Sequence, residues 1–145
     1  PGIKRSGIMI RRLPLEYILD QKQLDEIEAI LQSDFIEVGV HCVLMIDMAG
    51  NIVSSLDNGE VSFDIYSLAA LAAGNFGAVS AMANMVGENE FSLLFHKGQN
   101  ENLHFSRVTD DFLLITIFGK ETSLGFLRLK VAEAIKKFDT ILRSA

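Results

Sequence analysis

Apolar side chains recur every three to four residues in two parts of the chain, and each part predicts a helix. The first helix covers residues 21–35 and follows a capping box formed by Asp20 and Gln23. The last helix begins at Thr122 or Ser123 and ends near Leu142. Dense apolar runs between turn residues predict strands, which are Val40–Met48, a second strand ending at Leu56, Phe91–Lys97, Leu103–Val108 and Phe112–Phe118.

A third helix is predicted from Ile65 to Gly87, twenty-three residues without a charged side chain, nearly half of them Ala or Gly. Asp64 caps its start, and Gly87 ends it in the left-handed conformation. On a helical wheel, bulky side chains gather on one face, which we expect to pack on the core: Ile65, Leu68, Leu71, Ala72, Phe76, Val79, Met82 and Val86. The opposite face holds small or uncharged residues: Ala70, Ala73, Gly74, Gly77, Ala81 and Asn84. Since a surface helix of a monomer normally carries charge, this face is predicted to bind a partner.

Two other interpretations of this helix compete with a partner-binding face. Its length fits a membrane span, but Ser67 and Asn75 dilute the run and Asp64 and Glu88 bracket it, so we expect no span. A helix covered on both sides by its own domain is the second alternative. A domain of this size has few other helices or strands with which to cover the outer side of this helix.

The predicted elements follow one another in the order α-β-β-α-β-β-β-α. Short loops between the strands favour antiparallel pairing. The expected fold is therefore an α/β, or α+β, three-layer sandwich with a five-stranded antiparallel sheet. We divide the chain into a basic N-terminal arm, residues 1–19, and a single domain, residues 20–143. Residues 1–8 are compatible with an added tag, which would make Met9 the natural start.

Charge and composition exclude several classes of function. The net charge is −6, and because the first twelve residues carry four basic side chains, the remainder carries about −10. Nucleic-acid binding needs a basic face, so no nucleic-acid partner is expected. The single cysteine, Cys42, excludes an internal disulfide, and no signal peptide is evident. The expected location is the cytoplasm.

Candidate catalytic chemistry is sparse. A zinc site needs three or four converging ligands; His96 and His104 lie on neighbouring strands, with His41 and Cys42 elsewhere. The sequence contains no phosphate-binding glycine loop and no Ser-His-Asp pattern. We therefore expect no metal, no cofactor and no enzymatic activity of its own.

Several stretches resemble the Roadblock/dynein light chain superfamily, and in particular its bacterial members that regulate a small Ras-like GTPase. The matching stretches are Val43–Asn51, Ser67–Asn75, Gly87–Phe91, Phe95–Gly98 and Thr122–Lys130. The resemblance covers about residues 21–142. It implies the same sandwich fold and a regulatory role in cell polarity or gliding motility, with the protein concentrated at a cell pole.

The resemblance also implies two partners. The strand after the long helix would pair with the same strand of a second copy, giving a homodimer whose interface residues are Phe91, Leu93, Phe95 and Lys97. The GTPase would dock on the paired long helices, at Ala70, Ala73, Gly74, Gly77 and Ala81.

Such regulators activate GTP hydrolysis without an inserted arginine. Neither Arg107, on a strand, nor Arg128, inside the last helix, is well placed to serve as one. Two alternatives remain open, of which the first is a Roadblock scaffold that binds without activating. The second is a sensory module with a ligand pocket lined by Phe63, Phe76, Met82 and Met85.

Overall fold

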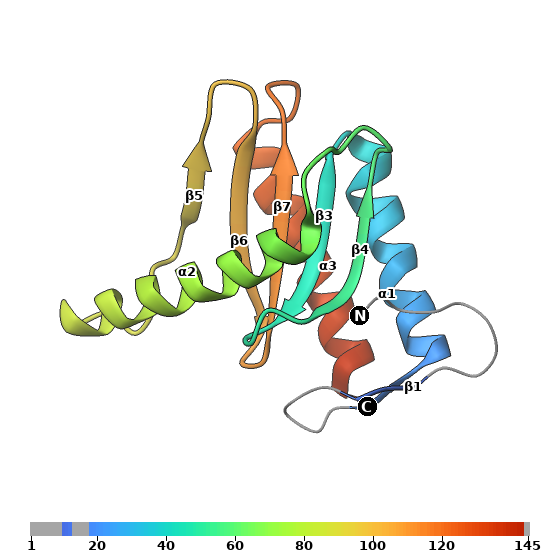
Figure 1. Ribbon diagram of the computed structural model, residues 1–145, viewed down its shortest axis with the longest axis horizontal. Helices are drawn as coiled ribbons and strands as arrows, with labels where there is room; N and C mark the ends of the chain where they lie inside the picture. The colour runs from blue at the N-terminus through green and yellow to red at the C-terminus, as the bar shows by residue number, and fades with distance from the viewer. Residues whose placement is uncertain (1–9, 13–17, 144–145) are drawn as a thin grey trace.

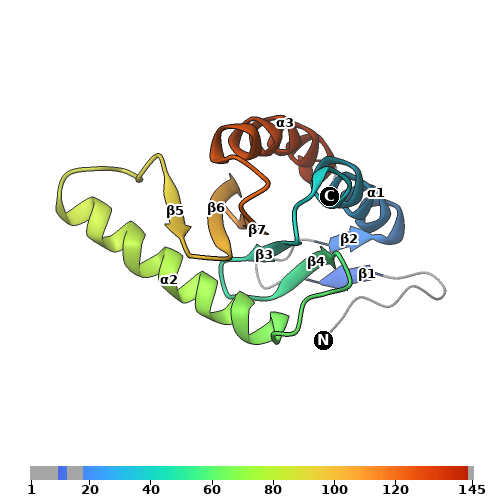
Figure 2. The same cartoon turned by 90° about the horizontal axis from the view of Figure 1, so that it is seen from above.

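The computed structural model describes residues 10–12 and 18–143. Within these residues the main element is an antiparallel sheet of five strands in the spatial order β4-β3-β7-β6-β5 (Figure 1). The strands are β3 (Cys42–Asp47), β4 (Ile52–Asp57), β5 (Leu94–Lys97), β6 (Asn102–Thr109) and β7 (Phe112–Phe118). Helices α1 (Gln21–Asp34) and α3 (Leu124–Arg143) cover one face of the sheet, and α2 (Ile65–Met85) crosses the other (Figure 2). The predicted three-layer sandwich is confirmed.

The layer of α1 and α3 forms the larger of two apolar cores. The α1 helix begins at the predicted capping box: the Gln23 backbone N–H donates to the Asp20 carboxylate at 2.8 Å, and the Asp20 N–H donates to the Gln23 side chain at 2.9 Å. A short 3-10 turn, η1 (Ile36–Val38), follows α1. The largest fully buried side chains between these helices and the sheet are Phe35, Phe112, Phe118 and Phe138.

The second core lies between the sheet and α2, and the helix contributes mainly small side chains to it. Ala69, Ala72 and Phe76 of α2 are buried against the sheet. Gly50, in the turn between β3 and β4, adopts φ 90°, and a Cβ there would lie 3.0 Å from the Cα of Ala70. Glycine is required at this turn because a side chain would clash with the helix backbone.

The α2 helix extends beyond the sheet. Its C-terminal half passes β5 and projects from the body of the molecule (Figure 1). Beyond Phe76, Ala83 is the only buried residue of the helix. Only the first half of α2 is therefore held by the sheet.

Two short strands at the N-terminus were not predicted. β1 (Ile10–Arg12) pairs antiparallel with β2 (Ile18–Asp20). Leu19, within β2, is fully buried in the core of α1 and α3. The expected tag and the start at Met9 lie outside the described residues.

Candidate functional site

The outer face of α2 carries the small residues that the sequence predicts as a docking site. Ala70, Gly74, Gly77 and Ala81 are exposed. In the described part of the chain, a Cβ placed on Gly74 or Gly77 would meet no atom within 4 Å. These four residues face solvent as expected, and their role in docking stays a prediction.

Ala73 does not belong to this face. It is 9 % exposed and packs with Ala69 and Ala72 beneath the helix, so its predicted place in the docking site is wrong. At 100° per residue the buried stripe is rotated by about 60° from the predicted one. The Gly50 turn approaches the backbone of Ala69 and Ala70 closely, and the buried side of the helix there carries small side chains beside the single ring of Phe76.

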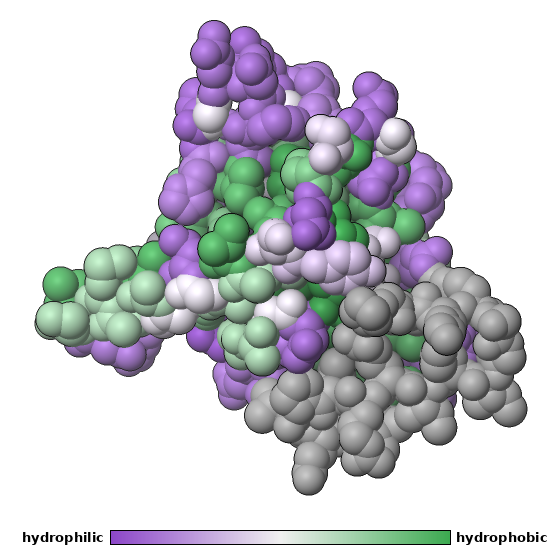
Figure 3. Space-filling view, in the orientation of Figure 1, coloured by the Kyte–Doolittle hydropathy of each residue, from purple (hydrophilic) through white to green (hydrophobic). Residues whose placement is uncertain are grey.

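The rotation exposes large apolar side chains, of which Leu71, Met82 and Val86 were expected in the core. They form what we term the apolar flank of α2: Leu71, Met82, Met85 and Val86, which are 72 %, 53 %, 85 % and 70 % exposed. Figure 3 shows apolar atoms over the projecting end of the helix. Large apolar side chains exposed on one side of a helix indicate a site that another molecule covers.

The length of α2 is the sequence feature that indicates an exposed apolar flank. A helix of 21 residues is about 32 Å long at 1.5 Å per residue. Five strands spaced 4.8 Å apart give a sheet about 19 Å wide. The sheet is therefore too narrow to cover the helix, and the excess must meet solvent or a partner.

In the described residues, α2 is long and apolar enough to cross a membrane, judged by length and composition alone. A spanning orientation would break the packing of Ala69, Ala72 and Phe76 against the sheet. A protein partner on the outer face leaves that packing intact. The packing of α2 is therefore compatible with a protein partner on its outer face, which stays a prediction.

β5 ends the sheet, and within the described residues no strand pairs with its outer side. The predicted strand Phe91–Lys97 is wrong in its first part, because β5 begins at Leu94. Phe91 and Leu93 precede β5 and are 37 % and 41 % exposed. Phe95 stacks on Phe118 at a ring-centroid distance of 6.0 Å, and Lys97 is exposed. The part of these residues in dimerisation stays a prediction.

The candidate ligands for a metal do not converge. His96 lies opposite Leu103, whereas His104 lies opposite Phe95. Because side chains alternate along a strand, the two imidazoles point to opposite faces of the sheet. Cys42 is buried, and burial raises the pKa of its thiol to about 12.

The four residues named for the alternative ligand pocket do not form a pocket under α2. Phe63, Met82 and Met85 are exposed, and only Phe76 of the predicted lining is buried. Arg107 lies 5.0 Å from the centre of the Phe76 ring and is ion-paired with Glu90. These four residues therefore do not form the ligand-binding site that a sensory module requires.

His41 has a structural role that its sequence context does not indicate. Its Nδ1 bonds Glu101 in the loop between β5 and β6, and its Nε2 bonds Glu121 after β7. Burial lowers the pKa of the imidazole, but the hydrogen bonds to the two carboxylates outweigh this and raise it above 6.5. The ring thus ties the β5–β6 hairpin to the start of β3.

The sheet order, the two helices on one face and the long helix on the other define an α+β sandwich of the Roadblock and profilin type. Residues 26–118 match the Roadblock/LC7 domain family. The chain belongs to this family, whose fold is one of regulatory and scaffold proteins and not of classical enzymes.

The chain is similar over most of its length to several known proteins. Myxococcus xanthus MglB is 31 % identical, with a TM-score of 0.79 over 86 % of this chain and 92 % of that one. The gliding protein MglB from Thermus thermophilus is 25 % identical, with a TM-score of 0.77 over 85 % and 93 %. An uncharacterised protein of Aquifex aeolicus is 27 % identical over 133 residues, which are 90 % of this chain and 81 % of that protein.

Proposed function

We propose that the protein is a homodimeric regulator of a small Ras-like GTPase of the MglA type and that it accelerates GTP hydrolysis. The observation that carries this proposal is the outer face of α2, an uncharged strip of small residues beside the exposed apolar flank. Membership of the Roadblock/LC7 family and similarity to two MglB proteins support the choice of partner. The resemblance further favours the cytoplasm and a cell pole as its location.

The chemistry of this face suits close docking of a folded partner. Gly74 and Gly77 leave the helix backbone open, so a partner backbone can approach without meeting a side chain. Leu71, Met82 and Met85 lie beside this strip and are more than half exposed. Methionine adapts its shape to a binding pocket, and burial of these side chains supplies the hydrophobic free energy of association.

A second copy of the chain completes the proposed surface. The outer side of β5 is unpaired in the described structure, and an exposed sheet edge readily pairs with another chain. Antiparallel pairing of two β5 strands would join the two sheets. Because α2 crosses one face of each sheet, the two long helices would lie on the same side of the joined sheet.

Activation in this proposal requires no inserted arginine, although such a residue accelerates hydrolysis by about 10³ to 10⁵. Arg107 is held by Glu90 and the ring of Phe76. Arg128 belongs to α3, which covers the opposite face of the sheet from α2. The dimer would instead stabilise the hydrolysis-competent conformation of the GTPase over its resting conformation.

Single-turnover GTP hydrolysis by the Ras-like GTPase of the same organism tests the proposal. Hydrolysis is measured alone, with the wild-type chain, and with the variant Gly77→Arg. Gly125→Arg is the matched control, since Gly125 lies in α3 and a Cβ there also meets nothing within 4 Å. We expect acceleration that Gly77→Arg abolishes and Gly125→Arg retains.

Other results lead to other conclusions. Binding without acceleration would replace the activator with a scaffold. Acceleration that survives Gly77→Arg would move the docking site away from α2. If no binding is detected at micromolar concentrations, the GTPase-regulator hypothesis is wrong.

A further inference from the structure

β6, which lies next to the edge strand β5, is paired with β5 over only part of its length. β5 pairs with β6 from Leu94, opposite Phe105, to Lys97, opposite Asn102. β6 continues past Phe105, so that Ser106 and Arg107 pair with β7 on one side and have no β5 partner on the other. Extended backbone that lacks a neighbouring strand leaves hydrogen-bonding groups without a strand partner.

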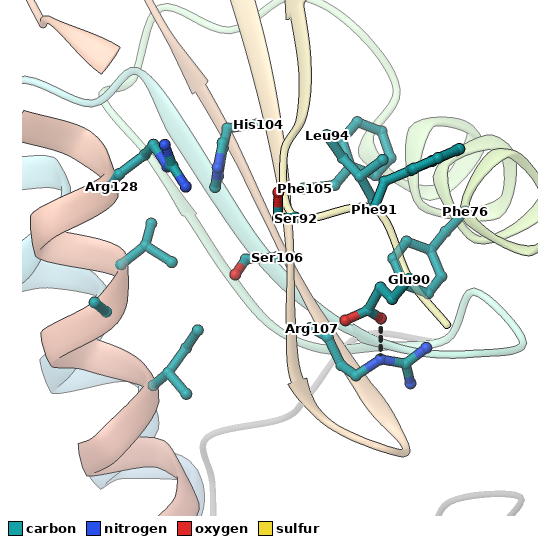
Figure 4. A pocket seen from close by; sticks show the side chains of 13 residues that line it. Phe76, Glu90, Phe91, Ser92, Leu94, His104, Phe105, Ser106, Arg107 and Arg128 are labelled. Carbon is teal, nitrogen blue, oxygen red and sulfur yellow. Dashed lines mark hydrogen bonds and ion pairs between the residues drawn. The ribbon is translucent and has the colours of Figure 1, made fainter. Parts of the chain in front are cut away.

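A cavity of about 250 Å³ lies along this bare stretch (Figure 4). Ser92 and Ser106 line it from the two chain segments, and Val131 and Ile135 line it from α3. The imidazole of His104 also lines it; this residue is 5 % exposed, and its Nδ1 has no hydrogen-bond partner in the described part of the chain. The space exceeds what one water molecule requires, so it can accept a side chain.

One apolar side chain that could fill the cavity, that of Leu93, lies outside it. Leu93 is 41 % exposed and is not among the residues that line the cavity. If the register of β5 and β6 continues by one residue, Leu93 comes opposite Ser106. Residues two apart on a strand share a face, so Leu93 would then point to the same side as Phe95, toward α3 and into the cavity.

An ion pair already holds this segment next to β6. Glu90 is paired with Arg107, which points toward Phe76 and away from α3 (Figure 4). In the continued register, Ser92 lies opposite Arg107, which places Glu90 diagonally across from Arg107 on the same face. Diagonal neighbours in a sheet remain within reach of long side chains. The ion pair is therefore compatible with both positions of the segment.

We propose that residues 91–93 form a strap that closes onto β6 and extends β5 back to Phe91. Closure moves Leu93 into the cavity and gives the backbone of Ser106 and Arg107 a strand partner. It also lengthens the free edge on which a second copy pairs. Only this last consequence rests on the proposed homodimer; closure itself is a property of the single chain.

Paired cysteines distinguish the open and closed positions. In the open position Ser92 and Ser106 line the same cavity, whereas in the closed position Leu93 is directly opposite Ser106. Two double variants, Leu93→Cys/Ser106→Cys and Ser92→Cys/Ser106→Cys, are oxidised gently in the folded state, and disulfide yield is measured by mass spectrometry. Cys42 can stay in place because it is buried. Circular dichroism checks that each variant is folded.

Closure predicts that the 93–106 disulfide forms in most chains and exceeds the 92–106 disulfide. The opposite order would overturn the proposal. Locking the closed state increases the population of the pairing-competent form, so we expect the oxidised 93–106 variant to dimerise about tenfold more tightly than the same variant reduced. Equal dissociation constants would refute the link to the interface. Absence of any dimer would refute the homodimer, while the disulfide yields still decide closure.

Discussion

Replacing the two glycines on the outer face of α2 by alanine should make the protein more stable and less active. Gly74 and Gly77 lie inside the helix with ordinary negative φ, and a methyl group at either position meets no neighbour within 4 Å. Glycine in a helix interior costs about 0.8–1.0 kcal/mol relative to alanine. The double variant should therefore gain about 2 kcal/mol, or roughly 4–8 °C in Tm for a chain of this size.

Thermal and urea unfolding followed by circular dichroism measure this gain. A series of protein concentrations is needed, because dimerisation also shifts Tm. Ala78→Gly is the matched control: Ala78 is exposed in the same helix, and this change should cost about 1 kcal/mol. In the hydrolysis assay, Gly74→Ala/Gly77→Ala should weaken activation, because two methyl groups hold the partner away from the backbone.

Two results would refute this reasoning. Loss of stability in dilute solution would mean that the small face packs against part of the same chain. A gain in stability with unchanged activation would mean that the glycines are not needed for docking. Stability gained at the expense of activity is the expected pattern for a binding surface.

The structure supports three further predictions, all measurable by urea unfolding. Gly50→Ala should destabilise the fold by about 1–3 kcal/mol, because φ is 90° and the added Cβ meets the Ala70 backbone. Burial, assisted by Arg128, lowers the pKa of His104 to about 4. In the unfolded chain His104 binds a proton near pH 6.5, whereas in the folded chain it stays neutral until about pH 4. The free energy of unfolding should therefore fall by on the order of 3 kcal/mol as pH drops from 6.5 to 4. His104→Gln should remove this pH dependence. His41 acts in the opposite direction, because its pKa is raised in the folded chain. The stability that it contributes is complete below pH 6.5 and is lost as pH rises through the folded-state pKa. A His41→Gln variant that still lost this stability would show that His41 is not its source.

Local chemistry was sufficient to predict the start of α1 and the end of α2. The capping box at Asp20 and Gln23 starts α1 as expected. Gly87 adopts φ 89° just after α2, as its predicted stop signal requires. These features depend on residues a few positions apart, so the sequence contains all the information that they need.

The orientation of α2 could not be derived in the same way. Both faces of the helix are uncharged, so the wheel has no polar side to mark solvent. Which side is buried depends on contacts with elements distant in sequence, among them the Gly50 turn, which lies close to the backbone of Ala69 and Ala70. For this reason the wheel predicts Ala73 outside and Leu71 and Met82 inside, whereas the structure shows the reverse.

The start of β5 also depends on a distant element. Alternating apolar residues predict a strand from Phe91, but pairing with β6 begins only at Leu94. Strand ends are set by a partner strand and not by propensity alone. The free edge of β5 as a pairing surface stays a prediction.

The projecting half of α2 has a consequence for how proteins of this kind can diverge. Past Phe76 only Ala83 is buried, so most substitutions there leave the core untouched and cost the fold little. Selection on those positions then acts through whatever molecule covers them. A duplicated copy could acquire a new partner by changes in one half of one helix, while the sheet and its other two helices stay as they are.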